Sequence, residues 1–150
     1  ILCLRSNSRM RMPANKRTDA YLDVVEQAGL SALVREVEFV KPDDEKGAVV
    51  AKILDENPDI DGIFAGDDTM AAICLNVMKQ RGLSAPDDIK VVGADGARRT
   101  MTFMPDLTTV RQDIDRIGEL AAQSIIALIN GDKPESNIKL PVELIEGKTA

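Results

Sequence analysis

The sequence predicts an α/β fold, with a mostly parallel sheet flanked by helices. Two observations lead to this prediction. The chain contains short apolar segments typical of buried strands, and longer segments whose apolar residues recur every three or four positions, as in helices. The two kinds of segment alternate along the chain. Strands and helices that alternate in this way form parallel sheets with right-handed crossover connections.

The first half of the chain predicts two strand–helix pairs. Residues 1–5 (ILCLR) are almost wholly apolar and indicate a short buried strand. Apolar residues at helical spacing predict a helix over 15–28, which Gly29 is placed to end. Alternating apolar and charged residues predict a strand over 33–40 with one wetter face. Helical spacing returns over 44–56 and stops at an Asn-Pro pair, because the residue before a proline disfavours the helix.

The middle of the chain repeats this pattern. A strand is predicted over 60–65 and a long helix over 68–81, which ends at a Gly-Leu pair. Residues 89–94 (IKVVGA) are apolar enough to be buried on both faces of the sheet. Residues 107–110 (LTTV) predict a short extended segment.

The last part of the chain predicts one long helix and one strand. Apolar residues recur at helical spacing over 113–130, and Gly131 follows them. Residues 138–145 (IKLPVELI) predict the final strand. Pro141 cannot donate a ladder hydrogen bond, so we expect this strand at an edge of the sheet.

Composition excludes several classes of function. The chain has 150 residues and a formal net charge of -6, so it is a poor nucleic-acid binder by itself. It has no histidine, which removes the Ser-His-Asp triad and most zinc sites. Cys3 and Cys74 are not in a CxxC motif, and a reduced, cytoplasmic compartment fits them. The sequence contains neither a run long enough to span a membrane nor a signal-peptide pattern.

Polar residues follow three predicted strands: SNSR the first, GDD the third and DGARR the fourth. Ligands of open parallel sheets bind beyond the carboxyl ends of the strands, so these loops are expected to share one mouth. Asp67 is placed to accept hydrogen bonds from ligand hydroxyl groups there. Asp95 fits either a bland Asp-Gly turn or the same site. Arg17 is either a solvated basic residue or a cation with a functional role, because a positive charge at a helix start is mildly unfavourable.

Asp68 stands directly before the apolar helical run of residues 70–78, a position typical of a helix N-cap. A different hypothesis gathers Asp67, Asp68 and Asp95 around a magnesium ion for phosphoryl transfer. The sequence offers no GxxxxGK[ST] or GxGxxG loop to hold a phosphate, which makes this enzyme the less favoured alternative.

The segment MAAICLNVM predicts a helix that is apolar on most of its sides. Such a helix is either enclosed in its own domain or shared with a partner. Under the second interpretation it forms a homodimer interface, to which the segment TMTFMPDL would add Met101, Phe103 and Met104. The predicted interface residues of the helix are Met70, Cys74, Val77 and Met78.

Two longer segments carry a family resemblance. DGIFAGDDTMAAICLNVMKQRGLSAPDDIKVVGADG, followed by PDLTTVRQDIDRIGELA, resembles the effector-binding core of LacI/GalR-type transcriptional regulators. The resemblance implies a two-lobed, periplasmic-binding-protein type I-like fold with a sugar or purine effector between the lobes. It implies that residues 1–112 form the C-terminal lobe, that 113–136 cross into the N-terminal lobe and that 137–150 return. The DNA-binding domain and most of the N-terminal lobe are expected upstream.

The same resemblance implies roles for individual residues. Arg17, Asp67 and Asp95 match positions that commonly contact the effector, and Gln112 ends the LTTVRQ motif where the chain crosses between lobes. Asp67 stands where the family more often has Asn, which favours hydroxyl donors and disfavours phosphate on that side. The family often stacks an aromatic on the ligand after the second strand. Residues 41–44 contain none, so we expect this aromatic to be absent.

These observations together predict the ligand-sensing domain of a cytoplasmic repressor. We expect it to bind a small polar effector such as a sugar, to form a homodimer and to reach DNA through the upstream domain. No catalysis, cofactor, metal or membrane contact is expected. The alternatives are a periplasmic sugar-binding protein of a transporter and the magnesium-dependent enzyme.

Overall fold

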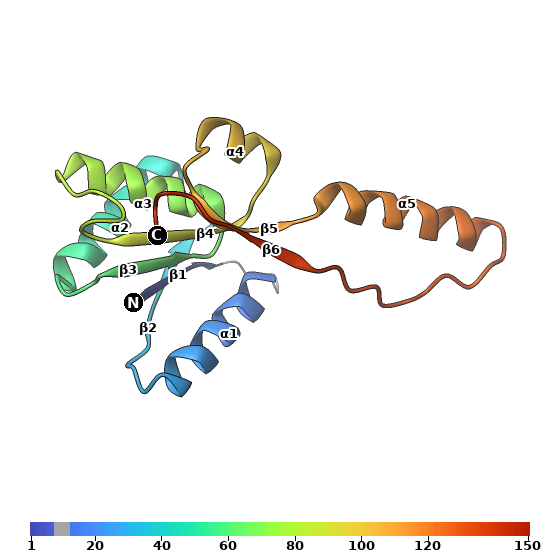
Figure 1. Ribbon diagram of the computed structural model, residues 1–150, viewed down its shortest axis with the longest axis horizontal. Helices are drawn as coiled ribbons and strands as arrows, with labels where there is room; N and C mark the ends of the chain where they lie inside the picture. The colour runs from blue at the N-terminus through green and yellow to red at the C-terminus, as the bar shows by residue number, and fades with distance from the viewer. Residues whose placement is uncertain (8–12) are drawn as a thin grey trace.

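The computed structural model describes residues 1–7 and 13–150, which form one six-stranded sheet with helices on both faces (Figure 1). The strand order is β2-β1-β3-β4-β5-β6, and every neighbouring pair is parallel except β5 and β6. This confirms the predicted fold class. The strands are β1 (Leu2–Asn7), β2 (Leu33–Glu38), β3 (Gly62–Ala65), β4 (Lys90–Asp95), β5 (Thr108–Gln112) and β6 (Val142–Ile145).

Helix α1 packs on one face of the sheet, and α2 and α3 lie side by side on the other (Figure 1). Four of the helices were predicted from their apolar spacing. The six-residue helix α4 was not, because it is too short to show a helical period. The helices are α1 (Pro13–Gln27), α2 (Asp43–Glu56), α3 (Asp68–Gln80), α4 (Arg98–Phe103) and α5 (Ile114–Ile129).

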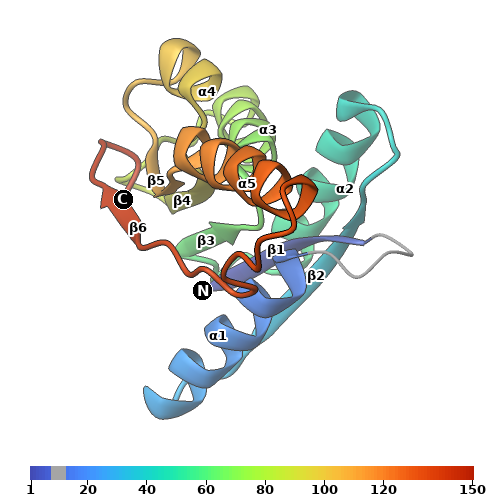
Figure 2. The ribbon, with the colours of Figure 1, turned by 90° about the vertical axis from the view of Figure 1, so that its right-hand side faces the viewer.

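Strand β6 lies at one edge of the sheet and β2 at the other (Figure 2). The edge position predicted from Pro141 is confirmed, but the strand begins only at Val142. Proline has no amide hydrogen, so the ladder with β5 starts after it, where Val142 pairs with Gln112. Strand β5 extends beyond its predicted end at residue 110, because Arg111 pairs with both β4 and β6 and Gln112 pairs with β6.

Two apolar layers hold the sheet. The larger one lies under α2 and α3 and contains Leu2, Leu4 and Ile63, all nearly inaccessible to solvent. The smaller one lies under α1 and is centred on Cys3 and Tyr21. The Tyr21 hydroxyl donates to the carbonyl of residue 1 at 2.7 Å and accepts from the amide of residue 33 at 3.2 Å. Helix α1 is thereby tied to the start of both β1 and β2.

Helix α3 is enclosed within its own domain. Its four residues that were predicted to form a homodimer interface are at most 5% exposed. That assignment is therefore wrong: α2 covers one side of α3, and β3 and β4 cover another, so its apolar surface is used inside one chain. The four residues are Met70, Cys74, Val77 and Met78. On α4, Phe103 is 76% exposed, whereas Met101 is half-buried, and Met104, just beyond the helix, packs against the core.

Helix α5 and the segment that returns from it extend away from the sheet (Figure 1). Several of its apolar side chains are exposed, with Leu128 62% and Ile129 78% exposed. Within residues 1–7 and 13–150, no helix combines the length and hydropathy needed to cross a bilayer. An exposed apolar stripe like that of α5 is typical of surfaces that pack against other protein.

We predict that Met78→Ala in the full-length protein lowers the free energy of unfolding by about 2–5 kcal/mol, because it leaves a cavity in the core. The loss is expected to be the same at low and high protein concentration, since the cavity forms within one chain. Denaturant unfolding over a wide concentration range measures this. The exposed neighbour Lys79 provides the control Lys79→Ala, and a loss that fades at high concentration would instead indicate a contact between chains.

Candidate functional site

Four strands end at one cavity of about 540 Å³. Ser6 comes from β1, Gly66 follows β3, Asp95 ends β4 and Gln112 ends β5. Arg17 reaches the cavity from α1. The predicted convergence of strand ends is therefore observed for β1, β3 and β4, and β5 joins them. Residues 8–9 of the predicted SNSR loop lie outside the described residues.

The four residues predicted to bind ligand all line this cavity: Arg17, Asp67, Asp95 and Gln112. Three of them form a hydrogen-bonded group. Arg17 Nη2 donates to Asp95 Oδ1 at 2.5 Å, and Gln112 Nε2 donates to the same oxygen at 2.6 Å. Arg17 Nη1 also donates to the Gly66 carbonyl at 2.5 Å. The guanidinium thus joins α1 to the ends of β3 and β4.

The backbone at Asp95 is in an uncommon conformation. Its φ is 112°, in the region that favours glycine, and Gly96 follows with φ 59°. A non-glycine residue held there costs on the order of 1–3 kcal/mol and persists only where its surroundings fix it. A Cβ at Gly96 would lie 2.7 Å from the Arg111 Cα, so only glycine fits against β5. The turn therefore aims Asp95 at Arg17 and Gln112 at an energetic cost.

Asp67 is the N-cap of α3. Its backbone is extended, and its Oδ1 accepts the Met70 amide hydrogen at 2.8 Å. Its Oδ2 lies 3.4 Å from the hydroxyl of Ser6, which donates to it at the cavity wall. One carboxylate oxygen therefore stabilises the helix, while the other bonds to Ser6, which also lines the cavity.

Asp68 is not the helix cap, so that prediction is wrong. It is the first residue of α3, it is 3% exposed, and it does not line the cavity. The carboxylate accepts the Gly96 amide hydrogen at 2.9 Å and the Thr109 hydroxyl hydrogen at 2.6 Å. Burial raises the pKa of Asp68 above the usual aspartate value, against the opposing effect of these hydrogen bonds.

An aromatic does lie at the cavity, contrary to the expectation that it would be absent. Phe39 lines the wall, together with Met70 and Ile73 of α3. Its ring lies 5.8 Å from Lys46 Nζ, within the range of a cation–π contact. The sequence predicted that residues 33–40 form one strand, but β2 ends at Glu38 and leaves Phe39 in the connection beyond it.

The three carboxylates of the magnesium hypothesis do not converge. Both oxygens of Asp68 accept hydrogen bonds, one from Gly96 after β4 and one from Thr109 in β5, and Asp95 is paired with Arg17. Within the part of the chain that the structure describes, no three acidic or cysteine side chains are arranged to hold a metal ion.

The thiol of Cys74 is buried in α3. Burial and the charge of Asp67 raise its pKa to about 12, so it stays protonated at neutral pH.

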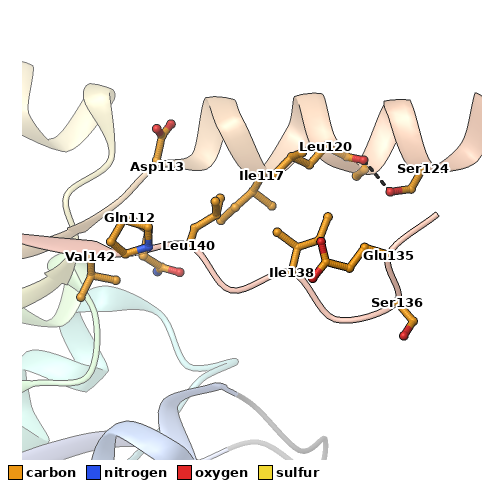
Figure 3. A pocket seen from close by; sticks show the side chains of 12 residues that line it. Gln112, Asp113, Ile117, Leu120, Ser124, Glu135, Ser136, Ile138, Leu140 and Val142 are labelled. Atoms are coloured by element: carbon orange, nitrogen blue, oxygen red, sulfur yellow. Dashed lines mark hydrogen bonds between the residues drawn. The ribbon is translucent and has the colours of Figure 1, made fainter.

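A second cavity, of about 500 Å³, lies between α5 and the segment that returns to β6 (Figure 3). Ile117 and Leu120 of α5 face Ile138 and Leu140 of the return segment across it (Figure 3). Gln112 lines both this cavity and the first one. The end of β5 therefore lies between the candidate ligand site and the protruding part of the chain.

Comparison with known proteins agrees with this geometry. The family model of the periplasmic binding protein-like domain matches residues 1–150. The ribose operon repressor of Halalkalibacterium halodurans is 32% identical over 139 residues, which cover 91% of this chain and 41% of that protein. The sucrose operon repressor of Pediococcus pentosaceus is 33% identical over 140 residues, 92% of this chain and 43% of that protein.

Solved structures show the same fold. The transcriptional regulator CelR in complex with cellobiose superposes with a TM-score of 0.85 and 25% identity, over 99% of this chain and 46% of that one. A LacI family regulator from Arthrobacter sp. FB24 in complex with lactose gives 0.82 and 26%, over 99% of this chain and 55% of that one.

The chain belongs to the periplasmic-binding-protein-like domain family. Within that family it corresponds to the effector-binding core of LacI-type transcriptional regulators. It spans about two-fifths of the length of the two repressors above, 41% and 43%.

We predict that the adjacent residues Asp67 and Asp68 differ in their contribution to stability. Asp67→Ala removes a helix cap and is expected to cost about 1 kcal/mol. Asp68→Ala leaves two buried donors, those of Gly96 and Thr109, without an acceptor, at about 1–3 kcal/mol each. Denaturant unfolding of both variants measures the difference. Equal losses, or a larger loss for Asp67→Ala, would contradict the assignment of cap and buried acceptor.

Proposed function

We propose that the chain is the ligand-sensing part of a transcriptional regulator and binds a small neutral saccharide in the cavity at the strand ends, without catalysis. The observation that carries this proposal is the convergence of Arg17, Asp67, Asp95 and Gln112 on one cavity. The ribose and sucrose operon repressors among its relatives and the cellobiose and lactose complexes among similar structures support a sugar as the ligand.

The lining has the chemistry that a sugar needs. Asp67 Oδ2 and the second oxygen of Asp95 supply acceptors for hydroxyl hydrogens, and the Arg17 guanidinium supplies donors. Phe39 and Ile73 form an apolar wall against which the C–H face of a sugar ring can pack. An apolar wall opposite a few fixed polar groups is typical of small-molecule sites.

The charges favour an uncharged ligand on the side of Asp67. Arg17 neutralises Asp95 at 2.5 Å, whereas the hydrogen bonds of Asp67 come from the neutral groups of Ser6 and Met70. A phosphate beside Asp67 would meet a partly exposed negative charge, and like charges at close range are unfavourable. Hydroxyl groups meet no such penalty.

We further propose that this site is one half of a two-lobed site. Residues 1–112 would form one lobe, 113–136 would belong to the other and 137–150 would return to the first. The protruding α5 with its exposed Leu128 and Ile129 supports this division. Ligand binding would favour the closed arrangement of the lobes by differential affinity and so alter the affinity for DNA.

The remaining parts of this proposal concern the whole protein. DNA would be bound through a domain outside residues 1–150, in the cytoplasm, by a homodimer. The exposed Phe103 on α4 is a better candidate for the dimer contact than the buried side chains of α3. A transporter's binding protein shares the fold, but the relatives above are repressors, which favours the regulator.

Titration calorimetry of the full-length protein with ribose, sucrose, lactose, cellobiose and a purine tests the proposal directly. One of the sugars is expected to bind. Asp67→Ala and Asp95→Ala are each expected to weaken that binding about tenfold or more, because hydrogen bonds to charged groups are worth about 1.5–3 kcal/mol. Unchanged affinity in both folded variants would contradict the proposed site.

Phe39→Ala is expected to weaken sugar binding about fivefold to tenfold, because it removes the aromatic part of the apolar wall. The adjacent Val40 is 87% exposed and does not line the cavity, so Val40→Ala is the matched control and should bind as the parent does. Equal affinities for the two variants would exclude Phe39 from the site.

A further inference from the structure

We propose that Asp68, which lies outside the cavity, is a positioning residue that holds Asp95 and Gln112 in their ligand-binding arrangement. The ligand-binding part of this inference rests on the proposed function. Asp68 and Asp67 are neighbours in sequence, yet their carboxylates serve opposite sides of the strand ends. Asp67 faces the cavity, and Asp68 faces the backbone that supports it.

Asp68 contacts three other places in the protein: β4, the turn that follows β4, and β5. A Cβ at Gly93 would lie 2.5 Å from Asp68 Oδ1, so the carboxylate lies directly against β4 and only glycine leaves room for it. Beyond β4, Gly96 donates its amide hydrogen to Oδ2 at 2.9 Å. In β5, Thr109 donates its hydroxyl hydrogen to Oδ1 at 2.6 Å. Thr109 is itself fully buried, and it pairs with Gly93 across the two strands.

The first consequence concerns Asp95. Its φ of 112° is costly for a residue with a side chain, so something must hold the turn. Gly96, the next residue, donates its amide hydrogen to the buried carboxylate of Asp68, and this bond holds the turn. Hydrogen bonds to a charged group are about twice as strong as neutral ones. If the turn relaxed toward ordinary dihedral angles, the Asp95 carboxylate would leave Arg17 and Gln112.

The second consequence concerns β5. Thr109 precedes Gln112 by three residues in the strand that leads from the sheet into α5. A fixed Thr109 therefore fixes the position from which Gln112 donates to Asp95 at 2.6 Å. Asp95 and Gln112 thus both lie on segments that Asp68 anchors, whereas Arg17 reaches them from α1.

Three variants separate positioning from simple stabilisation. Asp68→Asn keeps the shape but replaces the carboxylate, and Thr109→Val removes only the donor on β5. Met78→Ala is the control: it destabilises the other end of α3 without touching the strand ends. All measurements are made on the full-length protein at a temperature where each variant is folded, with the sugar found by calorimetry for the parent.

Asp68→Asn and Thr109→Val are expected to weaken sugar binding about tenfold, because the apparent affinity falls with the fraction of molecules whose site is correctly arranged. Met78→Ala is expected to bind as the parent does. A second measurement needs no ligand. Hydrogen–deuterium exchange of the Gly96 amide, resolved with overlapping peptides, is expected to be about tenfold faster in Asp68→Asn than in Met78→Ala.

Each outcome has a distinct meaning. Parent-like affinity in folded Thr109→Val and Asp68→Asn would overturn the positioning role, and so would Gly96 exchange no faster than in the Met78→Ala control. If Asp68→Asn does not fold, Thr109→Val alone decides the matter through affinity. If the parent binds none of the sugars, the proposed function fails, while the anchoring of the turn by Asp68 is still judged by exchange at Gly96.

Discussion

Parallel pairing of β1, β3, β4 and β5 places their carboxyl ends at one edge of the sheet, and the candidate site depends on this shared direction. Residues more than a hundred positions apart in sequence, Ser6 and Gln112, line the same cavity because each lies at or next to the carboxyl end of a strand. The two apolar layers under α1 and under α2 and α3 keep the strands in register. The arrangement of the polar residues at the strand ends therefore depends on apolar packing elsewhere in the sheet.

At the carboxyl ends of these strands, two adjacent aspartates have different roles: Asp67 lines the cavity, and Asp68 supports the backbone next to it. Asp67 precedes the helix and can cap it with one oxygen while the other faces the cavity. Asp68 is already helical, and its side chain is directed toward β4 and β5, where it meets two donors. Neighbouring residues point their side chains in different directions, so Asp67 lines the cavity while Asp68 binds the backbone and side chain behind it.

Much of this arrangement follows from sequence, and the failures have physical causes. Apolar spacing located the strands and the longer helices. The rule for ligand sites in parallel sheets predicted that Asp67 and Asp95 lie together, the family resemblance added Arg17, and all three line one cavity. Helix caps depend on which residue takes the first helical dihedral angles, a distinction of one position that spacing does not resolve. Phe39 was hidden at a strand end for the same reason, and the enclosure of α3 depends on α2, whose packing no local pattern reveals.

The pairing of Gln112 with Val142 has a topological consequence. The chain leaves the sheet after β5 and re-enters it at the adjacent antiparallel strand, so everything between the two is an excursion inside a hairpin. Such an insertion begins and ends at neighbouring points, and the entropy of closing it grows only slowly with its length, by about 0.6 kcal/mol for each doubling. The stability of the sheet therefore depends only weakly on the length of the segment inserted between β5 and β6. That segment can change in length without altering the order of the strands.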